Sequence, residues 1–233
     1  MSNSFFQFKQ FIVRHDHCVM KVGTDGVLLG AWGTVEGKRI LDIGTGTGLI
    51  ALMAAQRNPD AQVLGIDIDK EAVLQARENI AKSPFAERVT CILQDIAIFC
   101  PKNTYDAILC NPPFFTEDTL PDETRRALAR NSKSLPFSLL VSRVASLLTN
   151  EGKFSVIIPS QLVTEFVGLC ITKGLYMTRH CIVRTKANKP PRRALLTFST
   201  NIVQPAQYQE LCLTSLDGNR SQEYIALTKD FYI

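Results

Sequence analysis

Short apolar runs alternate with segments of helical periodicity from Arg39 onward. Several of the runs are apolar at consecutive positions, as parallel strands buried on both faces are. Strands that alternate with helices are typical of a mostly parallel sheet covered by helices on both faces. The sequence therefore predicts a Rossmann-like α/β fold with a seven-stranded sheet. The expected strands are Arg39–Ile43, Gln62–Ile68, Arg88–Leu93, Tyr105–Cys110, Lys153–Ile158, Tyr176–Arg184 and Arg193–Ser199.

The segments between these strands carry helix signals. Helices are expected at Leu49–Arg57, at Lys70–Ile80 after an Asp69 cap, and at Leu139–Leu148. Thr185–Arg192, between the last two strands, is polar, contains prolines and has no helical pattern. It predicts a hairpin, which makes the last strand antiparallel and places it at the edge of the sheet.

Two segments stand outside this pattern. Phe5–Val22 alternates apolar and polar residues, which predicts a hairpin before a short helix capped by Thr24. Phe115–Ser134 is a long charged stretch, and loops of that length are usually lids or binding loops. We expect a single domain, with an N-terminal extension (1–36), a core (37–200) and a C-terminal extension (201–233).

Composition narrows the class of protein. With 45% hydrophobic and 21% charged residues among 233, the chain has the balance of a globular domain. No run approaches the roughly 18 apolar residues of a membrane span, and the first residues lack a signal pattern. Seven cysteines without a CxxC pair indicate buried thiols in a reducing compartment. We therefore expect a cytoplasmic monomer with no membrane contact and no obligatory protein partner.

A glycine-rich turn follows the first strand of the core. Gly44, Gly46 and Gly48 allow a sharp turn and bring backbone amides close to a ligand at the next helix. The spacing differs from the GxGxxG of nicotinamide enzymes, and Asp42 precedes the first glycine by two residues. A carboxylate there would repel a pyrophosphate and attract an ammonium or sulfonium group. This favours S-adenosylmethionine as cofactor, with a nicotinamide dinucleotide as the alternative.

Acidic residues at two further strand ends complete the predicted cofactor site. Asp67, about twenty residues past the turn, is placed to bind the hydroxyls of a ribose. Asp95 ends the third strand and would reach an adenine amino group, with Ile68 and Ile96 flanking the ring. The alternative for Asp95 is a helix cap or a surface acid. Thr24 is a further candidate, for the methionine end of the cofactor.

The fourth strand ends in Asn111-Pro112-Pro113-Phe114. It should lie beside the first strand at the topological switch point, so its end faces the cofactor. An amide or ring NH₂ is a poor nucleophile, because its lone pair is delocalised. The Asn111 side-chain oxygen and the Pro112 carbonyl would accept its two hydrogens, and Phe114 would stack on a flipped base. The alternative is a structural turn followed by core aromatics.

These residues together resemble the class I amino methyltransferases with the N/D-P-P-Y/F motif, here with Phe in place of the commoner Tyr. The segments Phe8–Phe11 and Lys21–Trp32 resemble the N-terminal signature of bacterial tRNA (adenine-N6)-methyltransferases, which modify the adenosine 3′ of the valine tRNA anticodon, position 37. The resemblance covers nearly the whole chain. It implies S-adenosylmethionine as cofactor and N6 methylation of adenine in tRNA. Protein glutamine N5-methylation, rRNA or DNA methylation, and RNA binding without turnover stay open.

Basic residues gather in two predicted loops. The net charge of +4 permits a nucleic-acid partner without requiring one. The candidate RNA-binding residues are Arg125, Arg126 and Arg130 in the long loop and Lys186, Lys189, Arg192 and Arg193 around the late hairpin. Solvated surface charge is the alternative. In His15-Asp16-His17-Cys18 the cysteine would face away from the two histidines, so we expect no metal.

Overall fold

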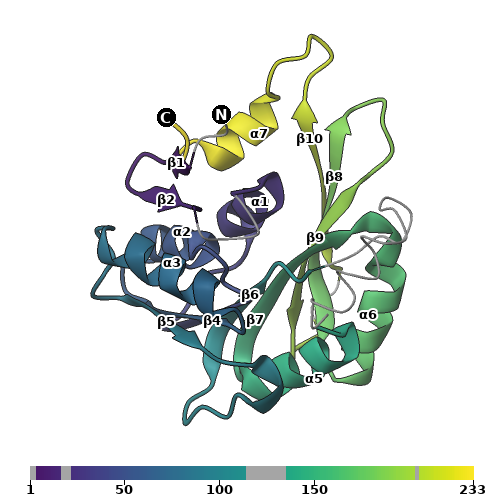
Figure 1. Ribbon diagram of the computed structural model, residues 1–233. Coiled ribbons are helices and arrows are strands. Elements are labelled where there is room, and N and C mark those ends of the chain that lie inside the picture. Colours follow the sequence, from purple (N-terminus) through teal and green to yellow (C-terminus); the bar gives the residue numbers. More distant parts are fainter. Residues whose placement is uncertain (1–3, 17–21, 114–134, 203–204) are drawn as a thin grey trace, which may run out of the picture.

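The computed structural model describes residues 4–16, 22–113, 135–202 and 205–233 (Figure 1). Its centre is an eight-stranded sheet with the order β10-β8-β9-β7-β6-β3-β4-β5. The strands are β3 (Arg39–Ile43), β4 (Gln62–Asp67), β5 (Val89–Leu93), β6 (Tyr105–Cys110), β7 (Leu148–Pro159), β8 (Tyr176–Lys186), β9 (Arg193–Ser199) and β10 (Gln207–Thr214). The five neighbouring strands β5, β4, β3, β6 and β7 run parallel. The mostly parallel α/β sheet expected from the sequence is confirmed.

The last part of the sheet differs from the prediction in two respects. Strand β9 is antiparallel to its neighbours, as expected, but it lies between β7 and β8 rather than at the edge. An eighth strand, β10, pairs in parallel with β8 and forms the edge. The first four residues of β10 are exposed, so the strand lacks the apolar pattern that marks the other strands. The prediction of seven strands with an antiparallel edge strand is therefore wrong in these two points.

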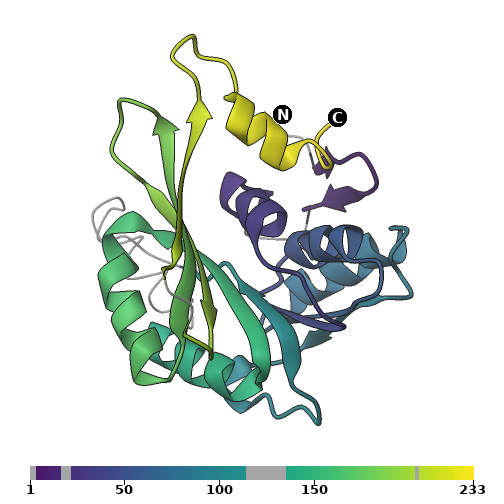
Figure 2. The same cartoon turned by 180° about the vertical axis from the view of Figure 1, so that it is seen from behind.

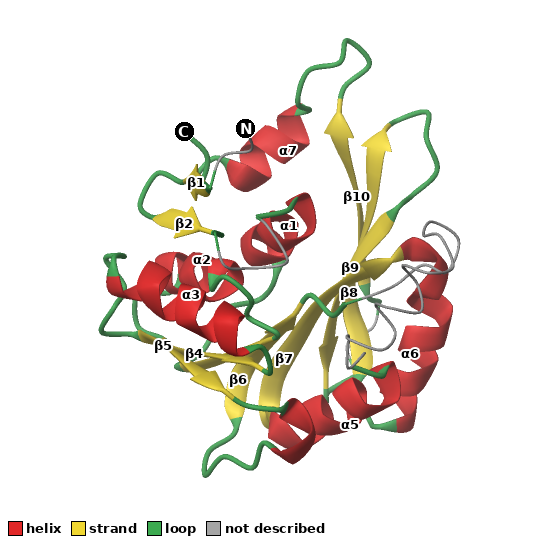
Figure 3. Ribbon diagram, in the orientation of Figure 1, coloured by secondary structure: helices red, strands yellow, loops and turns green. Residues whose placement is uncertain are grey.

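Helices cover both faces of the sheet, as Figures 1 and 3 show. The helices are α1 (Thr24–Trp32), α2 (Leu49–Arg57), α3 (Lys70–Ala81), α5 (Phe137–Leu147), α6 (Val163–Thr172) and α7 (Gln222–Thr228), with 3-10 turns η1 (Ile96–Ile98) and η2 (Ser160–Leu162). Apolar residues of α1, α2 and α3 form one core with Ile40 and Leu109. Those of α5 and α6 form the other with Leu41 and Ile108. Neighbouring residues of one strand thus enter different cores, which explains the consecutive apolar positions.

The N-terminal segment forms the expected hairpin, β1 (Phe5–Gln7) paired with β2 (Ile12–Arg14). Buried Asn79 of α3 fastens it: its side chain accepts from the Arg14 amide and donates to the carbonyls of Arg14 and Thr47, each at 2.9 Å. The hairpin also meets the C-terminal segment, because the Lys9 amide donates to the Phe231 carbonyl. Figure 2 shows α7 beside this hairpin.

Of the two helix caps predicted at Asp69 and Thr24, the structure confirms one. Asp69 caps α3 by accepting from the Glu71 amide, as predicted. Helix α1, by contrast, has Gly23 as its N-cap without a side-chain hydrogen bond, and Thr24 is its first residue. The predicted Thr24 cap is therefore wrong, because the extended residue before the first turn is the glycine. None of the helices in the described ranges has the length and apolar character of a membrane span.

Candidate active site

The glycine turn between β3 and α2 adopts backbone conformations that favour glycine. Gly44, Gly46 and Gly48 have φ of 69°, 56° and 82°. The Gly46 amide donates to Oδ2 of Asp67 at 2.8 Å, so the end of β4 holds the turn. No heavy atom lies within 4 Å of where a Cβ would stand on Gly44 or Gly46. The turn therefore presents bare backbone to open space.

Asp42 lies beneath this turn. Its side chain is fully buried and accepts a hydrogen bond of 2.6 Å from the Thr45 hydroxyl. Burial raises the pKa of Asp42 to about 7, and the charge of Asp67 adds to the rise, against the hydrogen bond from Thr45 and the Ala51 amide. Asp42 is not among the described residues that line the two cavities at this edge. Its position indicates that it shapes the turn, and direct contact with a ligand stays a prediction.

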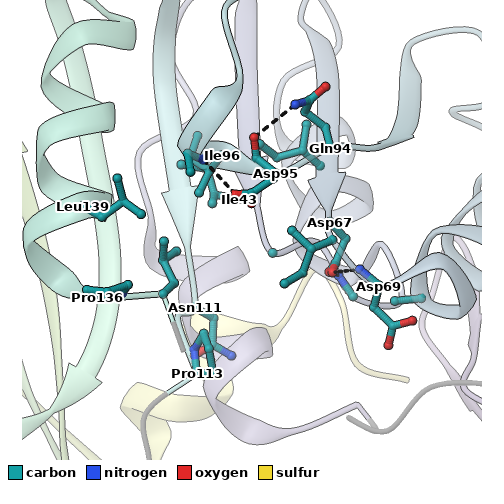
Figure 4. Close-up of a pocket in the computed structure, with 17 residues that line it drawn as sticks. Ile43, Asp67, Asp69, Gln94, Asp95, Ile96, Asn111, Pro113, Pro136 and Leu139 are labelled. Atoms are coloured by element: carbon teal, nitrogen blue, oxygen red, sulfur yellow. Dashed lines mark hydrogen bonds between the residues drawn. The ribbon is translucent and has the colours of Figure 1, made fainter. Parts of the chain in front are cut away.

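The first cavity, of about 340 Å³, lies where β3, β4 and β5 end (Figure 4). It brings together four predicted cofactor residues, Asp67, Ile68, Asp95 and Ile96, with the glycine turn. Asp95 also accepts from the Ala97 amide at 2.8 Å and caps η1, so the capping role that was the alternative is observed as well. In Figure 4 Asp67 and Asp95 lie across the cavity from Leu139, near the start of α5. Lining residues that the sequence did not predict include Asp69, Ala72, Gln94, Ala97, Leu135, Pro136 and Leu139.

The second cavity, of about 370 Å³, adjoins the first. It lies between the start of α1, the glycine turn and the prolines after β6. Thr24 lines it, and its contact with the cofactor stays a prediction. Asp25, the next residue of the same predicted helix start, lines it as well. Four residues line both cavities: Gly44, Gly46, Asn111 and Pro113.

The shared lining places Asn111 at the junction of the cavities. It follows β6, whose last residue, Cys110, pairs with Ile43 of β3, so the predicted neighbourhood of the first and fourth strands is confirmed. Pro112 is buried and lines the second cavity. Phe114 lies outside the described residues. Asn111 thus stands where a ligand of one cavity would meet a ligand of the other. Figure 4 shows it among the residues that line the first cavity.

The predicted RNA-binding residues separate into groups. Lys186, Lys189 and Arg192 are exposed around the turn from β8 to β9. Arg193 instead forms an ion pair with Asp25, Nε to Oδ2 at 2.8 Å. Arg125, Arg126 and Arg130 lie outside the described residues, as do His17 and Cys18. In the part of the chain that the structure describes, no group of three or more His, Cys, Asp or Glu side chains is arranged to hold a metal ion.

A family model agrees with this arrangement. The model described as "Methyltransferase small domain" matches residues 22–167, which span the start of α1, the glycine turn and Asn111. The chain belongs to this methyltransferase family.

Curated relatives of this methyltransferase match along the whole chain. A Bacteroides fragilis protein named tRNA1(Val) (adenine(37)-N6)-methyltransferase is 47% identical, over 100% of this chain and 99% of its own. A Tolumonas auensis protein of the same name is 44% identical, over 100% and 98%. Relatives with this name at such identity and coverage support the resemblance seen in the motifs.

Solved structures confirm the fold. A predicted O-methyltransferase from Agrobacterium tumefaciens aligns with a TM-score of 0.68 at 18% identity, over 89% of this chain and 96% of that chain. The glycopeptide N-methyltransferase MtfA, complexed with S-adenosylmethionine, aligns with a TM-score of 0.56 at 10% identity, over 77% and 99%. At these identities the likeness establishes the Rossmann-like methyltransferase fold alone.

Proposed function

We infer that this methyltransferase transfers a methyl group from S-adenosylmethionine to the N6 amino group of an adenine in tRNA, namely adenosine 37 of valine tRNA. The observation that carries the proposal is the meeting of two cavities at Asn111. One cavity has the acids and apolar walls that an adenosine needs, and the other opens beside it for an acceptor. The name of the full-length relatives supports the choice of tRNA and of N6.

The side chains that line the first cavity fit the cofactor. Asp67 would accept from the ribose hydroxyls, Asp95 from the adenine amino group, and Ile68 and Ile96 would enclose the ring. Ile68 is 48% exposed, a large apolar surface that a bound ring would cover. S-adenosylmethionine supplies an electrophilic methyl group on a sulfonium when it is bound.

The methionine end of the cofactor would lie along the glycine turn toward the second cavity. The backbone of Gly44 and Gly46 lines that space just before the start of α2, where the helix N-terminus favours a carboxylate. Thr24 lines the same space from the start of α1. The cationic groups of the cofactor would favour the ionised form of Asp42, which lies beneath the turn.

Catalysis would depend on hydrogen-bond acceptors and on positioning. The Asn111 side-chain oxygen and the Pro112 carbonyl accept the two amino hydrogens, which frees the nitrogen lone pair for attack. Phe114 would stack on the base, as the family motif implies. Methyl transfer leaves the nitrogen positively charged and strongly acidic, so it would give its extra proton to water and no strong base is needed.

The basic residues would bind the RNA backbone. Lys186, Lys189 and Arg192 are exposed at the turn that follows β8. We assign them to phosphate contacts, together with Arg125, Arg126 and Arg130. Arg193, paired with Asp25, would support the wall of the second cavity. A tRNA substrate also implies a cytoplasmic protein, and we keep the monomer and the divisions 1–36, 37–200 and 201–233 as predictions.

Tritium transfer from labelled S-adenosylmethionine tests the proposal. Total tRNA, bulk protein and rRNA are offered separately, and the labelled product is digested and identified. We expect label in N6-methyladenosine from tRNA. A valine tRNA transcript should accept the label, and a matched transcript with guanosine at position 37 should not. Label in glutamine would overturn the proposal in favour of a protein substrate.

A further inference from the structure

One row of paired residues crosses the sheet from β6, the strand that ends just before Asn111, to the edge strand β10. Cys110, directly before Asn111, pairs with Val156 of β7, and Val156 pairs with Leu196 of β9. Leu196 pairs with His180 of β8, and His180 with Tyr208 of β10. Paired residues lie on the same face, and four steps of about 4.8 Å put Tyr208 about 19 Å from the catalytic strand.

Burial changes along this row. Val156 and Leu196 are fully buried in the core beneath α5 and α6. His180 is half-buried, and Tyr208 at the edge is 68% exposed. The centroids of the His180 and Tyr208 rings lie 5.6 Å apart, and the angle between the ring planes is 58°. The face of the sheet that is buried at β9 is therefore partly exposed to solvent at β8 and β10, where these two aromatic rings lie.

The same face is basic further along β8. Residues two apart share a face, so Arg184 and Lys186 follow His180 in the direction of the strand. Arg184 forms an ion pair with Glu210 and donates to the Lys189 carbonyl, which fixes its guanidinium. The exposed Lys186 and Lys189 have no acidic partner among the described ion pairs. In Figures 1 and 2, β8 and β10 extend past the other strands toward this end.

We propose that the outer face of β8 and β10, formed by His180, Tyr208 and Arg184, is a stacking surface for unpaired bases of the RNA substrate. The inference rests on the proposed function and adds a contact outside the reaction site. Aromatic rings on an open sheet face stack on bases, while nearby cations hold the phosphates. Burial lowers the pKa of His180, which favours the neutral ring at physiological pH.

A tyrosine series tests the surface. Tyr208→Ala should weaken tRNA binding about tenfold, measured as the Kd in an anisotropy titration and as the KM for tRNA. Tyr208→Phe keeps the ring and should stay within about twofold of the wild type. The kcat at saturating tRNA and the Kd for S-adenosylmethionine should stay unchanged. Phe5→Ala, at an exposed aromatic residue of β1, is the matched control and should have no effect on tRNA binding.

Salt dependence separates stacking from phosphate contact. Tyr208→Ala should lower the affinity without changing the slope of log K against log salt, whereas Lys186→Ala should reduce that slope. Unchanged tRNA binding in Tyr208→Ala would overturn the proposal that this face binds RNA. An equal loss in Tyr208→Phe would overturn the stacking interpretation, and so would a change in molecular mass of Tyr208→Ala by light scattering. If the wild type methylates no tRNA, the proposed function has failed instead.

Discussion

Arg193 and Asp25 form an ion pair that joins two distant parts of the chain at the second cavity. Arg193 begins β9, and Asp25 lies in the first turn of α1, with Nε and Oδ2 at 2.8 Å. Asp25 lines the cavity, and both side chains are less than a third exposed. The pair therefore ties the wall of the proposed acceptor site to the hairpin that we assign to RNA binding.

Loss of the Arg193 charge should affect the cavity wall more than the phosphate contacts. Arg193→Ala leaves Asp25 without its partner, and we expect a several-fold loss of kcat/KM with an unchanged salt slope of tRNA binding. Arg192→Ala, at the exposed neighbour, should reduce that slope by about 1. A double-mutant cycle with Asp25→Asn should give a coupling of about 0.5–1 kcal/mol. A flattened slope in Arg193→Ala would restore the phosphate role that the sequence suggested.

Asn111 should be needed for methyl transfer but not for cofactor binding. Asn111→Ala removes one acceptor of the amino hydrogens, so kcat should fall about 10²- to 10³-fold. Calorimetry should give a Kd for S-adenosylmethionine close to that of the wild type. Asn111→Asp keeps an acceptor oxygen and should retain measurable activity. Turnover of the alanine variant at the wild-type rate would refute the assignment.

Asp67 should be important for the cofactor. Its carboxylate accepts from the Gly46 amide and, at 3.0 Å, from the Asp69 amide, besides its proposed contact with the ribose. Asp67→Ala should weaken S-adenosylmethionine binding about 10- to 100-fold, the range for hydrogen bonds to a charged group. Asp69→Ala, in the same cavity, should mainly cost about 1 kcal/mol of stability through the lost helix cap. Equal Kd values for the two variants would contradict the ribose role of Asp67.

Asp42 should make the stability of the ligand-free protein depend on pH. The carboxyl titrates near its ordinary value of 3.8 in the unfolded chain and near 7 in the folded one. Between these values the folded state binds more protons, so the free energy of unfolding falls as the pH rises from about 4 to 7. Asp42→Asn should remove this fall. Relative to the wild type, its free energy of unfolding should therefore rise by about 4 kcal/mol between pH 4 and pH 8.

Urea denaturation of both proteins across that pH range measures the difference. Asp60→Asn, at an exposed acid, is the control and should not change the pH dependence. If Asp42→Asn and the wild type differ by the same amount at every pH, the buried carboxyl does not titrate as its surroundings indicate.

Strong local patterns made most of the core predictable. The apolar runs of β3 and β6 and the glycines at positive φ follow directly from burial on both faces and from backbone sterics. The positions of Asp67 and Asp95 follow from the rule that parallel strands end at one edge. For these residues the sequence alone predicted which side chains share the cavity.

The errors concern features that depend on the partner of a segment. Whether β9 lies at the edge depends on where β8 pairs, and β10 is mostly polar because one side of it has no neighbouring strand. The ion-pair partner of Asp25 is Arg193, 168 residues away, and no local pattern in the sequence indicates it. Similarly, the burial of Asp42 depends on the turn folding over it rather than on its own neighbours in the chain.

The two cavities share the glycine turn and Asn111, but each also has walls of its own. Gln94 and Leu139 line only the first, whereas Thr47 and Leu49 line only the second. A smaller residue at Leu139 would therefore enlarge the chamber for the donor while leaving the walls around the acceptor in place. This separation makes the enzyme suited to an engineered donor analogue with a bulky adenine substituent, which would label its RNA targets among those of other methyltransferases.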